Sequence, residues 1–151
     1  MSQTKTNARK AVVQALYQWQ MTGQSLISIE LQFEEDGRLK GVQKSYFKEL
    51  FHGVPECLDV IDEVLSEFVD RPVDVIDPVE RAILRMGVYE LMHRPEMPYR
   101  VVLNESINLA KDFGADGSHR YVNGILDKVA QAKRAVEIKS KVQGARQKAQ
   151  D

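Results

Sequence analysis

The chain has 151 residues, of which 43% are apolar and 28% are charged, and its net charge is −1. This length accommodates one globular domain, or two small subdomains that share a core. The single cysteine, Cys57, excludes an internal disulfide and fits a reducing, cytoplasmic compartment. The N-terminus lacks the apolar segment of a secretory signal, and no run approaches the roughly 18 apolar residues of a membrane helix.

The small net charge conceals an uneven distribution of charged residues. Three basic and no acidic residues precede Glu30, whereas residues 119–151 contain eight basic and three acidic ones. Since the whole chain carries −1, residues 30–118 carry −9. Basic ends attract a polyanion, and an acidic middle attracts a basic protein. The charge pattern therefore favours a binding protein.

Amphipathic helices are predicted for the N-terminal half. Residues 8–21 place apolar side chains at i, i+3 and i+4 spacing, and Gly23 is a natural stop for this helix. Ser28 is suited to cap a short second helix. Residues 42–68 show the helical period again, and we expect a kink near Pro55 because proline lacks the backbone donor.

Helix boundaries are clearer in the C-terminal half. Asp77 is the predicted N-cap of a helix that has Pro78 at its first position, and Glu80 completes a capping box. A further helix is expected over residues 99–113, and Ser118 is the predicted cap of the last one. No strand-like alternation persists, so the sequence predicts an all-α protein with six to seven helices. Residues 136–151 are expected to form a basic, flexible tail.

Signals of enzyme chemistry are weak. His52, His93 and His119 are far apart in the sequence, and no Cys/His cluster or glycine-rich phosphate loop is present. Cys57 lies in an apolar helical window, as a buried structural thiol would. We therefore predict a protein without catalytic residues, metal or cofactor, and hence not an enzyme.

Three segments carry a family resemblance: ARKAVVQALYQWQ at residues 8–20, DPVERAILRMGVYELM at 77–92 and PYRVVLNESINLAKDFGADGSHRYVNGILDK at 98–128. In this order they resemble the NusB family of bacterial transcription antitermination factors, and the third segment is the most specific. The resemblance implies two packed helical bundles within one domain over residues 1–135, with subdomains at about 1–70 and 71–135.

The resemblance also implies a function and partners. It implies binding to the boxA element of single-stranded nascent RNA, as a heterodimer with the ribosomal protein that doubles as NusE. RNA polymerase and other Nus factors are implied as further partners, in antitermination on ribosomal RNA operons. Whether the free protein forms a homodimer stays open.

The basic and aromatic residues agree with RNA binding, because single-stranded bases stack on aromatic rings while Lys and Arg contact the backbone. Three cations open the first predicted helix, and cations and aromatic residues flank the loop at 114–117. One further tyrosine on the first helix is taken from the match to the family. The predicted RNA-binding residues are Lys5, Arg9, Lys10, Tyr17, Lys111, Phe113, Arg120 and Tyr121.

A structural role is the alternative for several of these residues. The three aromatic ones lie near apolar stripes and also suit a core, and Lys111 also suits a simple pairing with Asp112. The chain departs from the family at positions 4, 6 and 7, where it has Thr, Thr and Asn and arginines are common. We therefore expect fewer phosphate contacts and a stronger dependence on a protein partner.

The acidic middle of the chain is the candidate surface for that partner, since ribosomal proteins are typically basic. The resemblance places Glu80 at the contact with NusE, and Asp77 and Arg81 are assigned to the same surface. For Glu80, the capping role is an equal alternative.

Two other functions are compatible with the sequence. One is a helical adaptor that binds only proteins, and the other is a regulatory module that acts beside a separate RNA-modifying enzyme. The basic first helix and the aromatic and basic residues around the 114–117 loop favour the RNA-binding factor.

Overall fold

The computed structural model describes residues 2–139, and all regular secondary structure in this part is helical. The elements are α1 (Gln3–Thr22), α2 (Leu26–Glu35), α3 (Lys44–Glu56), α4 (Leu58–Ser66), the 3-10 turn η1 (Val73–Val75), α5 (Pro78–His93), α6 (Tyr99–Phe113) and α7 (Ser118–Lys133). The predicted all-α class is confirmed. Of the predicted basic tail, residues 140–151 lie outside the described part of the chain.

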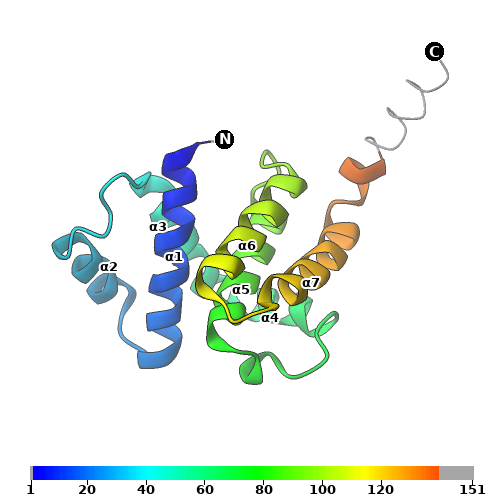
Figure 1. The fold of residues 1–151 in the computed structure, drawn as a ribbon, viewed down its shortest axis with the longest axis horizontal. Coiled ribbons are helices and arrows are strands. Elements are labelled where there is room, and N and C mark those ends of the chain that lie inside the picture. Colours follow the sequence, from blue (N-terminus) through cyan, green and yellow to red (C-terminus); the bar gives the residue numbers. More distant parts are fainter. Residues whose placement is uncertain (1, 140–151) are drawn as a thin grey trace, which may run out of the picture.

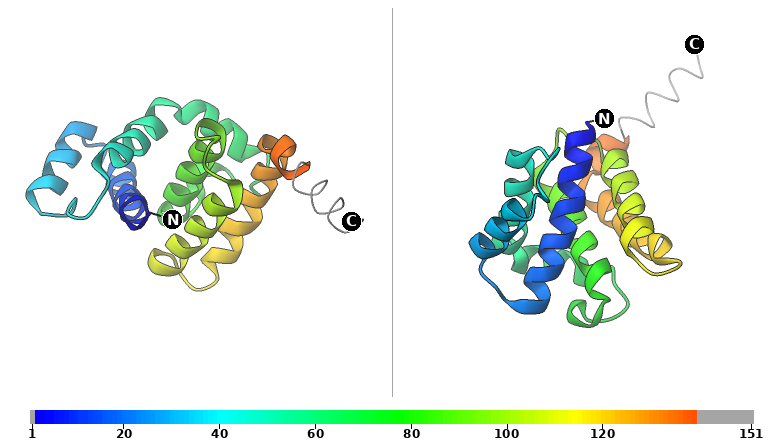
Figure 2. Two further views of the ribbon diagram at one scale, coloured as in Figure 1. Left: turned by 90° about the horizontal axis from the view of Figure 1, so that it is seen from above. Right: turned by 60° about the vertical axis from the view of Figure 1, so that its left-hand side comes forward.

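Helix α5 occupies the centre of the molecule and packs against α1, α3, α4, α6 and α7. The helices α1 to α3 lie on one side of it and α6 and α7 on the other (Figures 1 and 2). Its central position explains its composition, because nine of its sixteen residues are buried, among them Ile83, Leu84 and Val88. Among residues 2–139, no helix is long and apolar enough to cross a membrane.

Three predicted boundaries differ from the structure. The long pattern at 42–68 is two helices rather than one kinked helix: Pro55 lies inside α3, and the chain changes direction at Cys57, whose φ and ψ of −101° and 18° are not helical. The cap of α2 is Ser25 rather than Ser28, because the Ser25 hydroxyl accepts the backbone N–H of Ser28. The N-cap of α7 is Gly117, with a φ of 81°, whereas Ser118 is the first helical residue and makes no capping hydrogen bond among the described ones. All three differences concern turns, and the periodicity of the flanking apolar residues is unaffected.

A buried polar cluster joins α1 to the central helices. The Arg9 guanidinium donates to both carboxylate oxygens of Glu90 on α5, at 2.9 Å each. Its Nη1 lies 3.6 Å from a Glu105 oxygen on α6, which also accepts the Thr6 hydroxyl at 2.8 Å. The Tyr46 hydroxyl of α3 donates to Glu90 at 2.6 Å. Four helices are thus held by one set of charge-assisted hydrogen bonds, which fixes the orientation of α1.

Candidate nucleic-acid interface

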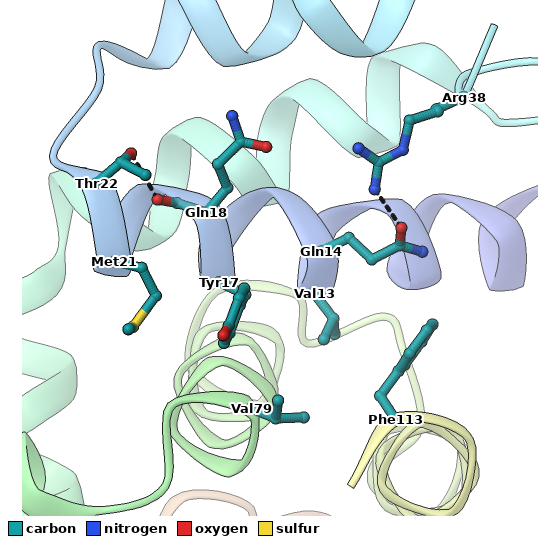
Figure 3. Close-up of a pocket in the computed structure, with 9 residues that line it drawn as sticks. All are labelled: Val13, Gln14, Tyr17, Gln18, Met21, Thr22, Arg38, Val79 and Phe113. Atoms are coloured by element: carbon teal, nitrogen blue, oxygen red, sulfur yellow. Dashed lines mark hydrogen bonds between the residues drawn. The ribbon is translucent and has the colours of Figure 1, made fainter. Parts of the chain in front are cut away.

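An open groove runs along the exposed side of α1 and has a volume of about 360 Å³. Figure 3 shows Tyr17 and Met21 pointing from α1 toward Val79 at the start of α5, and Phe113 pointing toward α1 from the end of α6. Arg38, from the loop between α2 and α3, lies on the opposite wall. No acidic side chain lines this groove, so an anionic ligand meets no repulsion from its walls.

The helical period of α1 explains how the groove receives its side chains. One stripe of the helix, which includes Ala8, Val12 and Leu16, is buried in the core. A second stripe at i, i+3, i+4 and i+7 spacing is presented to the groove, and it consists of Gln14, Tyr17, Gln18 and Met21. Tyr17 is 41% exposed, which resolves its role: it is a surface aromatic residue rather than a core residue.

Phe113 combines both roles that the sequence leaves open. It is half-buried and packs against the core, yet one part of its ring lines the groove. Helix α6 ends at this residue, and the capping residue Gly114 has an extended backbone. The groove thus brings together two predicted RNA-binding residues, Tyr17 and Phe113, that are far apart in the sequence.

Three predicted cations on α1 and α6 are not among the residues that line this groove. Lys10 precedes the groove stripe on α1, and its ammonium lies 3.8 Å from an Asp112 carboxylate oxygen, with both side chains nearly half exposed. Lys111 is exposed on the last turn of α6 and donates to no acidic partner among the described ion pairs. Lys5 is half-buried, and its ammonium lies 5.4 Å from the centre of the Tyr46 ring.

Arg9 does not belong to this exposed surface, which corrects the sequence-based interpretation. Its residue surface is 2% exposed, and its guanidinium is used by Glu90, Glu105 and Tyr46. A phosphate has no access to it in this conformation. Burial of the neighbouring Tyr46, together with the Glu90 charge, raises the pKa of that phenol well above its usual value. We therefore assign Arg9 to folding rather than to ligand contact.

Tyr121 and Arg120 lie outside the groove, on the first turns of α7. Tyr121 is half-buried, its hydroxyl donates to Asp70 at 3.4 Å, and the Arg71 guanidinium lies 5.1 Å from its ring centre. Burial raises the pKa of the Tyr121 phenol. Arg120 is exposed. Tyr121 thus forms an aromatic and basic cluster with Arg71, a residue that the sequence analysis did not single out.

The three predicted partner-binding residues lie around the start of α5. Asp77 is its N-cap and accepts the backbone N–H groups of Val79 at 2.9 Å and Glu80 at 3.3 Å. Among the described hydrogen bonds, none returns from the Glu80 carboxylate to the Asp77 backbone, so the reciprocal half of the capping box is absent. Arg81 donates to the carbonyls of Asp74 and Ile76 and thereby holds η1 against α5.

Glu80 lies close to the aromatic and basic cluster of α7. Burial and the charge of Asp77 raise the pKa of its carboxyl, while Ser118 and Arg71 oppose the rise. Among the described residues, the buried hydroxyl of Ser118 has no partner within hydrogen-bonding geometry. Glu80, the candidate partner residue, and Tyr121, a candidate RNA residue, therefore lie on the same side of the molecule.

The site includes residues that the sequence alone did not identify. Arg38, Gln14 and Gln18 line the groove beside Tyr17. The spacing of Gln14 and Gln18 relative to Tyr17 was a usable signal, because all three share one helical stripe. Arg38 had no such signal, since only the tertiary fold brings the loop between α2 and α3 to α1.

The geometry defines a class of protein: an all-helical protein with an exposed groove lined by two aromatic side chains and by Arg38. Residues 6–131 match the NusB family. The chain is 54% identical to the transcription antitermination protein NusB of Nitrosococcus oceani, over 93% of this chain and 95% of that protein. It is 46% identical to that of Pseudomonas fluorescens, over 92% and 84% respectively.

Solved structures agree with these sequence matches. A structure of T. maritima NusB superimposes with a TM-score of 0.74 at 30% identity, over 87% of this chain and 93% of that one. A complex of NusB and NusE with double-stranded RNA gives a TM-score of 0.78 at 24% identity, over 87% and 99%. The chain belongs to the NusB family, which confirms the resemblance. This membership also supports the prediction that the chain is not an enzyme.

Proposed function

We propose that this chain is a transcription antitermination factor that binds single-stranded RNA through the groove along α1. The observation that carries the proposal is the pair of aromatic side chains, Tyr17 and Phe113, in a groove free of acidic residues. Unstacked bases bind to aromatic faces, and neighbouring cations bind the phosphates. Lys10, whose ion-pair partner Asp112 is adjacent to Phe113, and Lys111, two residues before Phe113, supply such cations beside the groove.

A protein partner completes the proposal. The relatives are named transcription antitermination protein NusB, and one solved relative is a complex with NusE and RNA. We infer that the chain forms a heterodimer with NusE and binds boxA RNA of ribosomal RNA operons in the cytoplasm, together with RNA polymerase and other Nus factors. Glu80, with Asp77 and Arg81 beside it, is the proposed contact for NusE.

The RNA in that solved complex is double-stranded, whereas an aromatic groove suits an unpaired base. The two RNA forms can be separated by experiment. Fluorescence anisotropy should measure binding of the full chain, with and without NusE, to a short boxA-like single strand and to the same sequence in a duplex. We expect the single strand to bind more tightly.

Tyr17 variants test the groove itself. Tyr17→Ala should weaken single-strand binding by about 1–3 kcal/mol, the usual loss of one stacking contact, and Tyr17→Phe should retain most of the affinity. Leu31→Ala, at an exposed apolar residue of α2 outside the groove, is the control and should leave the affinity unchanged. Equal affinity for Tyr17→Ala and the wild type would exclude the groove as the RNA site.

A further inference from the structure

A second groove continues from the first on the other side of Gln14. It has a volume of about 400 Å³ and shares Gln14 and Arg38 with the groove that contains Tyr17. Its walls carry three cations, Lys10, Arg38 and Lys40, and no acidic side chain. The two grooves therefore form a continuous path along α1, aromatic at one end and basic at the other.

The fold holds the loop between α2 and α3 firmly beside α1. The Asn7 side-chain amide donates to the Gly41 carbonyl at 3.0 Å, and the Gln43 backbone N–H donates to the Thr4 carbonyl at 3.1 Å. Gly37 and Gly41 have φ values of 74° and 70°, a conformation that favours glycine and shapes the loop. The loop is thus a fixed wall of the second groove.

Arg38 is held in place by its neighbours, and its positive charge is not neutralised by an ion pair among the described residues. Its guanidinium stacks 3.8 Å from the centre of the Phe33 ring and donates to the Gln14 side-chain carbonyl. Neither Arg38 nor Lys40 takes part in an ion pair among the described residues, and both are exposed. Of the nearby acidic residues, Glu34 pairs with Lys44 at 2.7 Å and Asp112 lies 3.8 Å from Lys10. Glu35 and Asp36 precede the loop, but neither lines the second groove, and neither pairs with Arg38 or Lys40 among the described ion pairs.

We propose that Arg38 and Lys40 form a second RNA contact, in which they bind the sugar-phosphate backbone of the strand whose bases occupy the Tyr17 groove. This inference rests on the proposed RNA-binding function and extends it to the α2–α3 loop. Thr4, Thr6 and Asn7 leave the start of α1 with few cations, and the buried Arg9 reduces them further. The loop supplies phosphate contacts in their place.

The experiment compares salt dependence in the full-length chain. Arg38→Gln/Lys40→Gln removes two charges from the loop, and Lys128→Gln/Lys133→Gln removes two from exposed positions of α7 as the matched control. Binding to a boxA-like single strand is measured over a series of salt concentrations. Each lost phosphate contact should make the slope of log K against log salt shallower by about 0.7, so the loop variant should change it by about 1.4. The control should keep the wild-type slope.

RNA length provides a second readout. The strand is shortened one nucleotide at a time from either end, and the loop variant should converge on the wild type once the nucleotides beside the loop are removed. An unchanged slope for the loop variant, or an equal change in the control, overturns the inference about the loop. The proposed function is upheld separately, if the wild type binds the single strand and Tyr17→Ala loses that binding. No binding by the wild type, with or without NusE, overturns both.

Discussion

The guanidinium of Arg9 and the carboxylates of Glu90 and Glu105 have at most 4% of their side-chain surfaces exposed. Removing charges from water costs several kcal/mol per ion, and only close pairing with complete hydrogen bonding offsets that cost. Here the single guanidinium of Arg9 lies against two carboxylates, and the hydroxyls of Thr6 and Tyr46 donate further hydrogen bonds to them. The cluster therefore depends on Arg9, because no other cation makes a hydrogen bond to these two carboxylates among the described residues.

Arg9→Met keeps the length of the side chain but leaves both carboxylates without their cation. We expect the free energy of unfolding at neutral pH to fall by about 3–5 kcal/mol. In the variant the buried carboxylates favour protonation, so the folded state binds more protons than the unfolded chain and the deficit narrows as the pH falls. Urea unfolding at two pH values measures both effects.

The adjacent residue provides the control for this substitution. Lys10 pairs with Asp112 at the surface, with both side chains more than 40% exposed, so Lys10→Met should cost less than about 1 kcal/mol. Similar losses for the two variants would show that the buried cluster contributes no more than a surface pair.

Glu80 should make the stability of the fold depend on pH in the direction opposite to that of a salt-bridged carboxylate, whose pKa is lowered by folding. Burial, with the charge of Asp77, raises the pKa of its carboxyl, so the folded state binds the proton more tightly than the unfolded chain does. Its contribution to stability therefore declines as the pH rises from about 4.3, the usual glutamate value, through the raised pKa. Glu80→Gln should flatten this part of the curve of unfolding free energy against pH. If Glu80→Gln shows the same dependence of unfolding free energy on pH as the wild type, the raised pKa of Glu80 is not its cause.

At the scale of helices, local sequence signals located most of the elements but not all of their ends. Asp77 and Pro78 begin α5 as predicted, because a cap and a proline act within one turn of the chain. The helical period located the others, since burial of one face repeats with the helix itself. The break between α3 and α4 was not predicted, because Pro55 is tolerated inside α3 and the turn at Cys57 carries no glycine or proline of its own.

The cap of α5 can be tested with a matched pair of acidic residues. Asp77→Ala leaves the backbone N–H groups of Val79 and Glu80 without their acceptor, so the free energy of unfolding should fall by about 1 kcal/mol. Asp74→Ala, in the exposed η1 turn, should have little effect, because the hydrogen bond from Arg81 goes to the backbone carbonyl of Asp74, which the substitution retains. Thermal unfolding of both variants and of Asp77→Asn, which retains an acceptor, measures the cap. Equal stability of Asp77→Ala and Asp74→Ala would argue against it.

The candidate site was less predictable than the helices, because it depends on contacts between distant segments. The pairing of Tyr17 with Phe113 requires α6 to end beside α1. Arg38 reaches the groove because tertiary hydrogen bonds, among them the one from Asn7 to Gly41, hold its loop against α1. Arg9 shows the reverse case, in which a residue from a basic segment is removed from the surface by carboxylates on α5 and α6. Charge counts along the sequence do not distinguish these outcomes.

For the whole molecule, the arrangement of the two candidate surfaces bears on how partner and RNA act together. The proposed RNA groove lies on one side of the start of α5, where Val79 lines it, and Glu80 is the next residue along that helix. Glu80 also lies within electrostatic reach of Arg71 and Tyr121. A partner bound at Glu80 would therefore lie at the edge of the RNA site, where it can add contacts to the same strand.

We accordingly expect NusE and single-stranded boxA RNA to bind together, each tightening the other by the same factor, as linkage requires. A coupling free energy of about 1–3 kcal/mol is typical of such systems. Calorimetric titration of NusE into the chain with and without RNA, and of RNA with and without NusE, measures both sides of the cycle. Glu80→Lys should weaken NusE binding and lower RNA affinity only when NusE is present, with thermal unfolding of the variant as the check on its fold. Competition between NusE and RNA, or an equal loss of RNA affinity in Glu80→Lys without NusE, would contradict the arrangement of adjacent, cooperating surfaces.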